Sequence, residues 1–228
     1  MSDRVLETLR KSKIFSVLTR EELNTIRPYF EELNLRKDNY VFMESDPSDF
    51  LFIASKGKVK IIKHSAAGKD IILEIKLPGE LFCCSAVLDS RPFPESAQAM
   101  EDGTVLKISR RNLLKIMDQF PLLKDEMGRY TSRKLRDAHE ILRDIASETA
   151  DKRIAHVLLR LADTAGVEEA GYTKIDFHIT RQEIADMIGS TVETCIRMMS
   201  RFQKEGMIVS SDNRIMINKQ ALENYLAQ

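Results

Sequence analysis

The chain has 228 residues, of which 43% are hydrophobic and 31% are charged, a composition typical of a globular protein with a buried core. Its 35 Lys and Arg residues balance 35 Asp and Glu residues, so any nucleic-acid binding has to rely on a local basic face. No apolar run approaches the ~18 residues of a membrane-spanning helix, and the charged N-terminus lacks a signal-peptide core. The cysteines (Cys83, Cys84 and Cys195) are too few for a disulfide framework and fit a reducing compartment. We therefore expect a cytoplasmic protein without membrane contact.

Short helices are predicted for residues 1–30, where Thr19 and Glu22 form a helix-start pattern. Between Leu33 and Ile108 the apolar period changes to two, which is typical of β-strands. The clearest strand runs are residues 40–42, 50–53, 59–63, 71–75 and 104–108. Turn residues separate them at 46–47, 56–57, 67–69, 78–79 and 102–103. Many short strands with regular turns predict an antiparallel sandwich or a barrel-like roll.

Two helices are predicted next, one over residues 109–117 and a longer one that begins at Pro121 and runs without Gly or Pro from Arg129 to Ser147. Seam positions recur in the long helix at alternating spacings of four and three: Thr131, Leu135, Ala138, Leu142 and Ile145. This spacing is that of a two-stranded coiled coil. The alternative is an amphipathic helix packed on its own domain, but the apolar stripe is narrow and therefore favours a helical partner. We expect a homodimer interface here.

The C-terminal part is predicted to contain a helix over residues 149–165, a polar connection over residues 166–173 and then two short helices. Thr180 and Glu183 form a capping box for the first short helix, and Gly189 provides the turn. Thr191 caps the second helix, which Gly206 ends. Residues 207–209 and 215–217 are predicted to form two strands around the polar turn 210–214, and residues 219–226 a terminal helix.

The two short helices are predicted to form a helix-turn-helix. Apolar residues at helical spacing should form its buried face: Ile184, Ala185, Ile188, Val192, Ile196, Met199 and Phe202. Glu193, Arg197 and Arg201 then lie near the opposite face, which a helix-turn-helix places in the DNA major groove. Cys195 lies beside this face and is interpreted as a small packed residue.

This stretch resembles the DNA-binding motif of the CRP/FNR family of bacterial transcription regulators. The matching residues are Thr180-Arg181, Ile184-Ala185, Gly189, Thr191, Glu193-Thr194 and Arg197. Further features that resemble the family are the turn at 44–47, where the family usually has Glu-Gly-Asp, the lone Gly57, and Pro78-Gly79-Glu80. The resemblance implies an α+β fold with a double-stranded β-helix (jelly-roll, cyclic-nucleotide-binding-like) sensor domain over residues 1–120. A dimerisation helix over 121–148 and a winged helix-turn-helix domain over 149–228 follow.

The resemblance also implies how DNA is read. Dimers of this kind read half-sites on the order of 34 Å apart. Glu193 can accept a hydrogen bond from cytosine and Arg197 can bind guanine with two hydrogen bonds, which predicts a shared G-A step in each half-site. Thr180, Gln182 and Thr194 match positions that contact phosphate; Arg201 either adds a phosphate contact or is a solvated charge.

Two positions depart from the family pattern. Val192 stands where CRP-type proteins have an arginine, and the following residues are closer to the FNR branch. That branch has a serine where this chain has Ile196, which either contacts a thymine methyl group or faces the core. The outer bases of the half-site are therefore not predicted. RNA polymerase is a further partner implied by the family.

The sensor cassette departs from the pattern of cyclic-AMP binders. Cys83 and Cys84 occupy the positions of a Gly-Glu pair, and Glu95-Ser96 stands where Arg-Ser binds the cyclic phosphate. A carboxylate there would repel the phosphate, and Arg91 is out of register, so cyclic AMP is not expected as the effector. Three cysteines cannot supply a four-cysteine site, which argues against an iron–sulfur cluster.

Three effector hypotheses stay open for the region of Cys83, Cys84, Glu95 and Ser96. Cys83 resembles the axial haem ligand of CO sensors in the family, with His64 and His139 as candidate second ligands, although Ser85 replaces the family's histidine. A strained vicinal disulfide between Cys83 and Cys84 would make a redox switch, and the alternative for this pair is two packed thiols near a sheet turn. The third hypothesis is an unidentified small molecule bound between the roll and the long helix.

The competing class of protein is a thiol oxidoreductase that uses Cys83 and Cys84. The chain has no Cys-x-x-Cys motif and no recognisable arrangement of nucleophile, base and orienting group. We therefore expect a ligand- or redox-gated transcription regulator rather than an enzyme.

Overall fold

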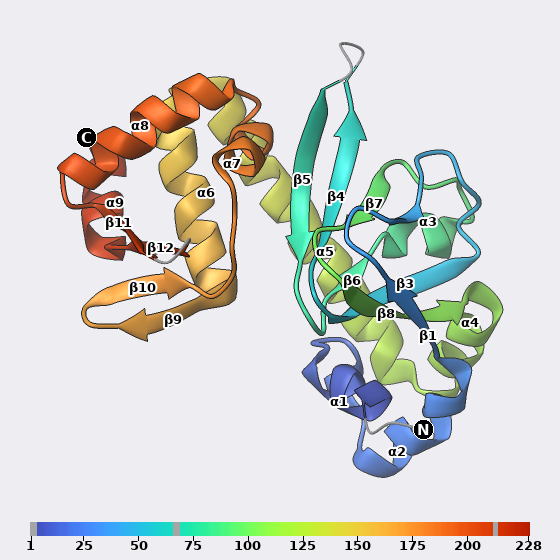
Figure 1. The fold of residues 1–228 in the computed structure, drawn as a ribbon. Coiled ribbons are helices and arrows are strands. Elements are labelled where there is room, and N and C mark those ends of the chain that lie inside the picture. Colours follow the sequence, from blue (N-terminus) through green and yellow to red (C-terminus); the bar gives the residue numbers. More distant parts are fainter. Residues whose placement is uncertain (1–3, 66–68, 212–213) are drawn as a thin grey trace. The chain divides into compact units, whose positions relative to one another are not determined.

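A computed structural model describes residues 4–65, 69–211 and 214–228 (Figure 1). The predicted turns over residues 67–69 and 210–214 lie partly outside these ranges. The chain packs as two compact units, Met1–Asp137 and Ala138–Gln228, and the boundary falls within the long helix α5 (Pro121–Ser147). Each unit has a core of its own and is described in turn.

The first unit opens with short helices, as predicted. They are α1 (Arg4–Lys11), the 3₁₀ turn η1 (Phe15–Val17), α2 (Arg20–Ile26) and η2 (Arg27–Tyr29). The predicted capping box at the start of α2 is present, because Thr19 and Glu22 each bond the other's backbone N–H. Leu9, Ile14 and Phe15 are fully buried, which joins these helices to the core of the roll.

The roll consists of two four-stranded antiparallel sheets. One sheet has the order β1 (Glu31–Leu35), β8 (Gly103–Ser109), β3 (Phe50–Lys56), β6 (Leu81–Phe82). The other has the order β2 (Tyr40–Phe42), β7 (Ser96–Ala99), β4 (Val59–His64), β5 (Asp70–Lys76). The predicted strand runs are confirmed within β2, β3, β4, β5 and β8.

The sequence pattern did not reveal β1, β6, β7 or the short helix α3 (Cys84–Asp89). Strand β6 has only two residues, too few for a periodic signal. Strand β7 buries the small residues of Ser-Ala-Gln-Ala, which carry little strand propensity, and its place is set by pairing with β2 and β4.

The inner faces of the two sheets meet in a core with an aromatic cluster at its centre. The rings of Phe42 and Phe93 are stacked with centroids 3.8 Å apart. Phe52 contributes from the other sheet, 5.4 Å from Phe42, and stacks on Phe82 at 5.6 Å. The cluster therefore joins the segment before β7 to strands of both sheets.

Helices α4 (Arg110–Gln119) and α5 follow the roll, with Ser109 capping α4. The start of α5 is built into the first unit, because Leu123 and Met127 are buried in the core and the Tyr130 hydroxyl donates to the Leu81 carbonyl at 2.8 Å. The predicted seam residues Thr131, Leu135, Ala138, Leu142 and Ile145 are all exposed.

The second unit packs α6 (Ala150–Ala165) against the helices α7 (Arg181–Ile188), α8 (Val192–Lys204) and α9 (Lys219–Leu226). A four-stranded antiparallel sheet completes it, in the order β11 (Ile208–Ser211), β12 (Arg214–Ile217), β10 (Tyr172–Ile175), β9 (Gly166–Glu169). Strands β11 and β12 confirm the predicted wing, whose tip at residues 212–213 is outside the described ranges.

The prediction of a polar connection over residues 166–173 is wrong, because β9 and β10 form a hairpin there. Ala170 and Gly171 both have positive φ, 51° and 81°, which a two-residue hairpin turn of the primed type requires. All four residues of β9 are exposed, so no alternation marked it as a strand. Its position follows from pairing with β10, which buries Thr173 and Ile175.

Replacing Phe93 with alanine should lower the free energy of unfolding by about 3–5 kcal/mol, because the ring is buried and its loss leaves a cavity. Urea unfolding followed by circular dichroism measures the effect. Leu122→Ala is the control, because Leu122 is 61% exposed and its truncation should change stability by less than about 0.5 kcal/mol. Equal effects of the two changes would contradict the role given to the aromatic cluster.

Candidate functional site

Local capping interactions build the helix-turn-helix. The Thr180 hydroxyl accepts from the Glu183 N–H at 3.1 Å, and the Glu183 carboxylate accepts from the Thr180 N–H at 2.7 Å. Gly189 ends α7 in the left-handed conformation with φ 62°. The Thr191 hydroxyl then caps α8 by accepting from the Thr194 N–H at 3.3 Å. The predicted starts and the predicted turn of both helices are confirmed.

Helix α8 has one buried face and one exposed face. Cys195, Met199 and Phe202 are buried, so the interpretation of Cys195 as a packed residue is confirmed. Glu193 and Arg197, one turn apart, are exposed. Ile196 is 49% exposed and lies on the outer side, which corrects its placement in the buried face. Cys195 takes the core position instead, because it lies four residues before Met199, which in turn lies three residues before Phe202.

The residues predicted to contact phosphate differ in their surroundings. Thr180 and Gln182 are exposed at the start of α7, and the Gln182 amide donates to Asp186 at 2.7 Å. Thr194 is half-buried, and its hydroxyl is 3.2 Å from that of Thr191. All three lie at helix N-termini, where partial positive charge favours an anion.

Arg201 is held by groups of its own unit. Its guanidinium bonds Glu205 at 2.8 Å, lies 3.8 Å from Asp151 and stacks over the ring of Tyr225 at 5.6 Å. A phosphate contact by Arg201 would have to compete with these interactions. The structure also shows a contact that the sequence did not indicate, since Arg181 donates to Ser210 of β11 at 3.0 Å and so ties α7 to the wing.

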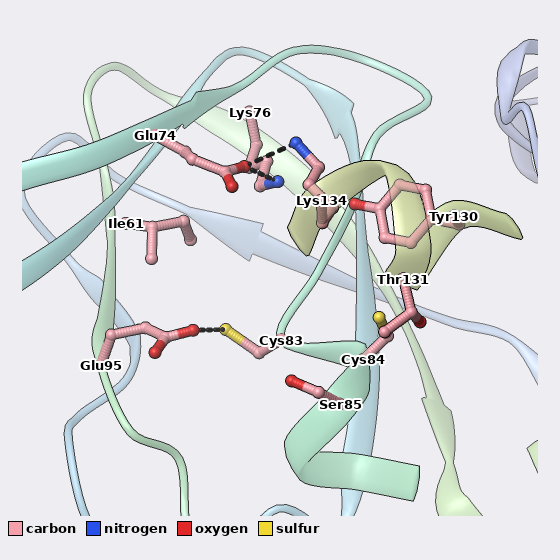
Figure 2. A pocket seen from close by; sticks show the side chains of 10 residues that line it. All are labelled: Ile61, Glu74, Lys76, Cys83, Cys84, Ser85, Glu95, Tyr130, Thr131 and Lys134. Carbon is pink, nitrogen blue, oxygen red and sulfur yellow. Dashed lines mark hydrogen bonds and ion pairs between the residues drawn. The ribbon is translucent and has the colours of Figure 1, made fainter. Parts of the chain in front are cut away.

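The sensor cassette lines a pocket of about 130 Å³ in the first unit (Figure 2). Its walls come from β4, β5, the turn after β6, the start of α3, the segment before β7, and α5. The lining residues are Ile61, Glu74, Lys76, Cys83, Cys84, Ser85, Glu95, Tyr130, Thr131 and Lys134. The structure thus brings together Cys83, Cys84 and Glu95 from the predicted effector region.

Ser96 and Arg91 are placed elsewhere. Ser96 is fully buried, and its hydroxyl accepts from the Glu44 N–H at 2.8 Å, so it supports the turn after β2 and does not line the pocket. Arg91 is exposed and lies 3.8 Å from Asp89. No arginine lines the pocket.

Sequence reasoning missed the ion cluster of this pocket. Glu74 bonds both Lys76 and Lys134, the latter at 2.9 Å. Burial opposes the ionisation of Glu74, but the two ammonium groups outweigh it and hold the pKa of the carboxyl below its usual value. Lys76 is only 4% exposed; burial opposes its charge too, but Glu74 raises its pKa. The sequence did contain one indication of this cluster. Glu74 and Lys76 follow Ile72 at intervals of two residues, which places all three on the same face of β5, and Ile72 is buried.

The thiols lie on the opposite side of the pocket. Cys83 has φ 57° and donates its S–H to Glu95 at 3.3 Å. Burial, followed by the neighbouring charge of Glu95, raises the pKa of the Cys83 thiol, and burial raises the pKa of the Cys84 thiol. Burial also raises the pKa of the Glu95 carboxyl, which the bond from Cys83 only partly offsets. Both cysteines are free thiols.

These surroundings do not fit haem. An axial cysteine ligand binds as a thiolate, whereas Cys83 is a hydrogen-bond donor whose raised pKa favours the thiol. His64 is paired with Asp70 at 2.8 Å, and neither His64 nor His139 lines the pocket. Across the described ranges, no cluster of three or more His, Cys, Asp or Glu side chains could hold a metal ion.

No helix in the part of the chain that the structure describes is long and apolar enough to cross a membrane. Residues 152–225 match the family model of the Crp-like helix-turn-helix domain, and residues 32–120 match that of the cyclic nucleotide-binding domain.

Curated relatives agree with these matches. The transcriptional activator protein anr of Pseudomonas aeruginosa is 32% identical over 185 residues, which cover 80% of this chain and 75% of that protein. A CRP-like cAMP-activated global transcriptional regulator of Mycobacterium tuberculosis is 26% identical over 212 residues, 93% of this chain and 95% of the relative.

Among solved structures, FixK2 from Bradyrhizobium japonicum aligns with a TM-score of 0.75 and 27% identity, covering 86% of this chain and 96% of that one. The relatives are transcription regulators, and the domain that carries Glu193 and Arg197 is of a DNA-binding type. The jelly-roll domain, the long helix and the helix-turn-helix, together with these matches, show that the chain belongs to the CRP/FNR family of transcription regulators.

Proposed function

We propose that this chain is a homodimeric regulator that reads a palindromic DNA site with a G-A step in each half and is gated by an effector other than cyclic AMP. One observation carries the proposal: Glu193 and Arg197 project one turn apart from the exposed face of α8, whose other face is buried. In this assignment residues 1–120 are the sensor, 121–148 the dimerisation helix and 149–228 the DNA-binding domain.

The base contacts follow from the chemistry of the two side chains. Arg197 can donate two hydrogen bonds to guanine O6 and N7, and Glu193 can accept from a cytosine amine. Ile196, exposed beside them, is placed to contact a thymine methyl group. Thr180, Gln182 and Thr194 contact phosphate and fix the register, with Arg201 as a weaker candidate because Glu205 and Asp151 already engage it.

The homodimer rests on the exposed seam of α5. Leu135, Leu142 and Ile145 are 58%, 63% and 51% exposed, although each is a large aliphatic side chain. Thr131 and Ala138 complete the seam at coiled-coil spacing and are exposed as well. Pairing two copies of α5 would bury this stripe and hold two recognition helices at the spacing of successive major grooves.

The pocket is the proposed effector site. Thr131 belongs both to the pocket and to the seam, so a ligand there can change the packing of the dimerisation helix. Gating would then be a population shift between arrangements of the two DNA-binding domains. A regulator of this class acts in the cytoplasm, and the name of the activator anr supports RNA polymerase as a partner.

The alternative of a thiol redox protein is disfavoured by the state of the thiols. A nucleophilic or redox-active cysteine needs a lowered pKa, whereas burial raises the pKa of the thiols of Cys83, Cys84 and Cys195. Glu95 accepts the thiol hydrogen of Cys83 at 3.3 Å, but the raised pKa of Cys83 keeps the proton on sulfur.

Arg197→Lys or Glu193→Gln should reduce discrimination at the G-A step by roughly 1–3 kcal/mol, because a base-specific contact is lost. Gel shifts with matched and step-altered sites at several salt concentrations measure the ratio of affinities. Lys204→Gln is the control, since it removes a charge from the same helix two turns beyond Arg197 and should affect all sequences equally. An equal loss of affinity for all DNA sequences in the Glu193 and Arg197 variants would contradict base readout. If the wild-type protein binds no DNA at any salt concentration or redox state, the proposed function is wrong.

Leu142→Glu should weaken dimerisation by on the order of 100-fold, because each copy would place a carboxylate in the apolar seam. Sedimentation velocity over a concentration series measures the shift toward monomer. Leu122→Glu is a matched control on the same helix, since Leu122 is as exposed as Leu142, 61% against 63%, but lies outside the seam. If both changes have the same effect, the seam is not the interface.

The thiols of the native protein should react slowly with a disulfide reagent. Burial raises the pKa of Cys195 to about 11, which leaves on the order of 100-fold less thiolate at about pH 8 than an unperturbed cysteine has. Cys83 and Cys84 should behave likewise, and all rates should increase with pH and on unfolding in urea. A Cys83 that reacts as fast in the native protein as in the unfolded one would favour a thiol switch.

A further inference from the structure

The pocket contains more positive than negative charge on its β5 and α5 side. Lys76 and Lys134 both bond the same oxygen of Glu74 (Figure 2). An ammonium group has three N–H donors, so a single carboxylate cannot satisfy two of them. Lys76 is buried, and Lys134 is about one-third exposed, so neither group is fully hydrated. Glu80 also favours the charged form of Lys76, but it lies outside the pocket lining and its carboxylate accepts from the Leu77 N–H. A negative group inside the pocket would complete the cluster.

The other carboxyl of the pocket, Glu95, does not supply that group. It lies across the pocket and accepts the thiol hydrogen of Cys83 at 3.3 Å (Figure 2). Because burial raises its pKa, Glu95 takes up a proton more readily than an exposed glutamate. With Glu95 protonated, the pocket holds two ammonium groups against one carboxylate.

The size of the pocket limits the ligand. Its volume of about 130 Å³ is close to the roughly 150 Å³ of an engineered protein cavity that accepts benzene. A ligand of about this size is far smaller than a nucleotide. The Ser85 hydroxyl lines the same pocket and can donate a further hydrogen bond.

We propose that the pocket binds a small oxyanion, a carboxylate or an inorganic oxoacid, between Lys76, Lys134 and Ser85, and that binding is accompanied by uptake of a proton at Glu95. The inference rests on the proposed function in that it takes this pocket as the effector site. Charge-assisted hydrogen bonds from two ammonium groups hold the anion, and protonation of Glu95 removes the repulsion across the pocket.

The pH dependence follows from the groups that face Glu95. These are Cys83 after β6, Glu74 and Lys76 of β5, and Lys63 of β4. Glu74 raises the pKa of Lys76 and burial raises the pKa of the Cys83 thiol, so the proton taken up with the anion goes to Glu95, whose pKa burial raises. As pH rises, the ionised form of Glu95 repels the anion, and the affinity decreases.

Isothermal titration calorimetry of the full chain tests the proposal with sodium acetate, sodium benzoate and inorganic phosphate at constant ionic strength. We expect one site per chain, with affinity that decreases as the pH is raised. Comparing the affinities for acetate and benzoate with the affinity for phosphate shows whether the site prefers a carboxylate or an inorganic oxoacid. Lys134→Gln should weaken binding about tenfold or more, and Ser85→Ala, at an exposed position, should weaken it without affecting folding.

Two variants act as controls. Lys124 lies on α5 like Lys134, but it is outside the pocket and pairs with Asp118 of α4. Lys124→Gln should therefore leave binding unchanged. Glu95→Gln fixes a neutral group, so binding should persist and lose its pH dependence.

Absence of binding by all three anions, or equal binding by wild type, Lys134→Gln and Ser85→Ala, would overturn the proposal. A pH dependence retained in Glu95→Gln would overturn the coupled proton. Gel shifts with wild-type protein separate this outcome from the proposed function, because a protein that binds DNA but no anion refutes only the pocket ligand.

Discussion

The anchoring of α5 is the constraint on which the rest of the structure depends. Its first turns are held in the sensor unit by Leu123 and Met127, and by the hydrogen bond from Tyr130 to the Leu81 carbonyl. Near its other end, Asp144 is buried and bonds Arg160 of α6 at 3.1 Å in the second unit. Between these anchors the helix contributes Lys134 to the pocket and leaves its aliphatic seam exposed. One helix therefore links the pocket, the exposed seam and the unit that contains the helix-turn-helix by covalent continuity.

The sensor pocket shows how a shared fold can carry different ligand chemistry. Two positions that hold glycine in the family pattern have side chains here, Ser45 with φ 74° and Cys83 with φ 57°. Each left-handed residue costs about 1 kcal/mol, and the surrounding turns maintain the conformation. The charges have moved as well, because Glu95 replaces the arginine of nucleotide binders while Lys76 and Lys134 supply positive charge from the opposite wall. The lining therefore places two lysines and no arginine around the pocket, and this arrangement underlies the proposal of a small anion as ligand.

Much of the DNA-binding unit could be predicted because its determinants are local. The capping box of α7, the N-cap Thr191 of α8, the left-handed Gly189 and the spacing of Met199 and Phe202 act within a few residues of one another, so the pattern alone located α7 and α8. The exposed position of Ile196 and the engagement of Arg201 by Glu205, Asp151 and Tyr225 were not predictable in this way. The contacts of Arg201 with Asp151 and Tyr225 depend on α6 and α9, which are distant from α8 in the sequence.

By itself, the sequence determined the strand runs of the roll, the long helix with its seam, and the two helices that carry Glu193 and Arg197. These features follow from periodicity and capping, which are short-range properties of the chain. Only the tertiary structure decided the composition of the pocket, because β4, β5, the turn after β6 and α5 each contribute to it. It also decided the charge state there, since the ionisation of Glu74, Lys76 and Glu95 depends on burial and on partners from other elements.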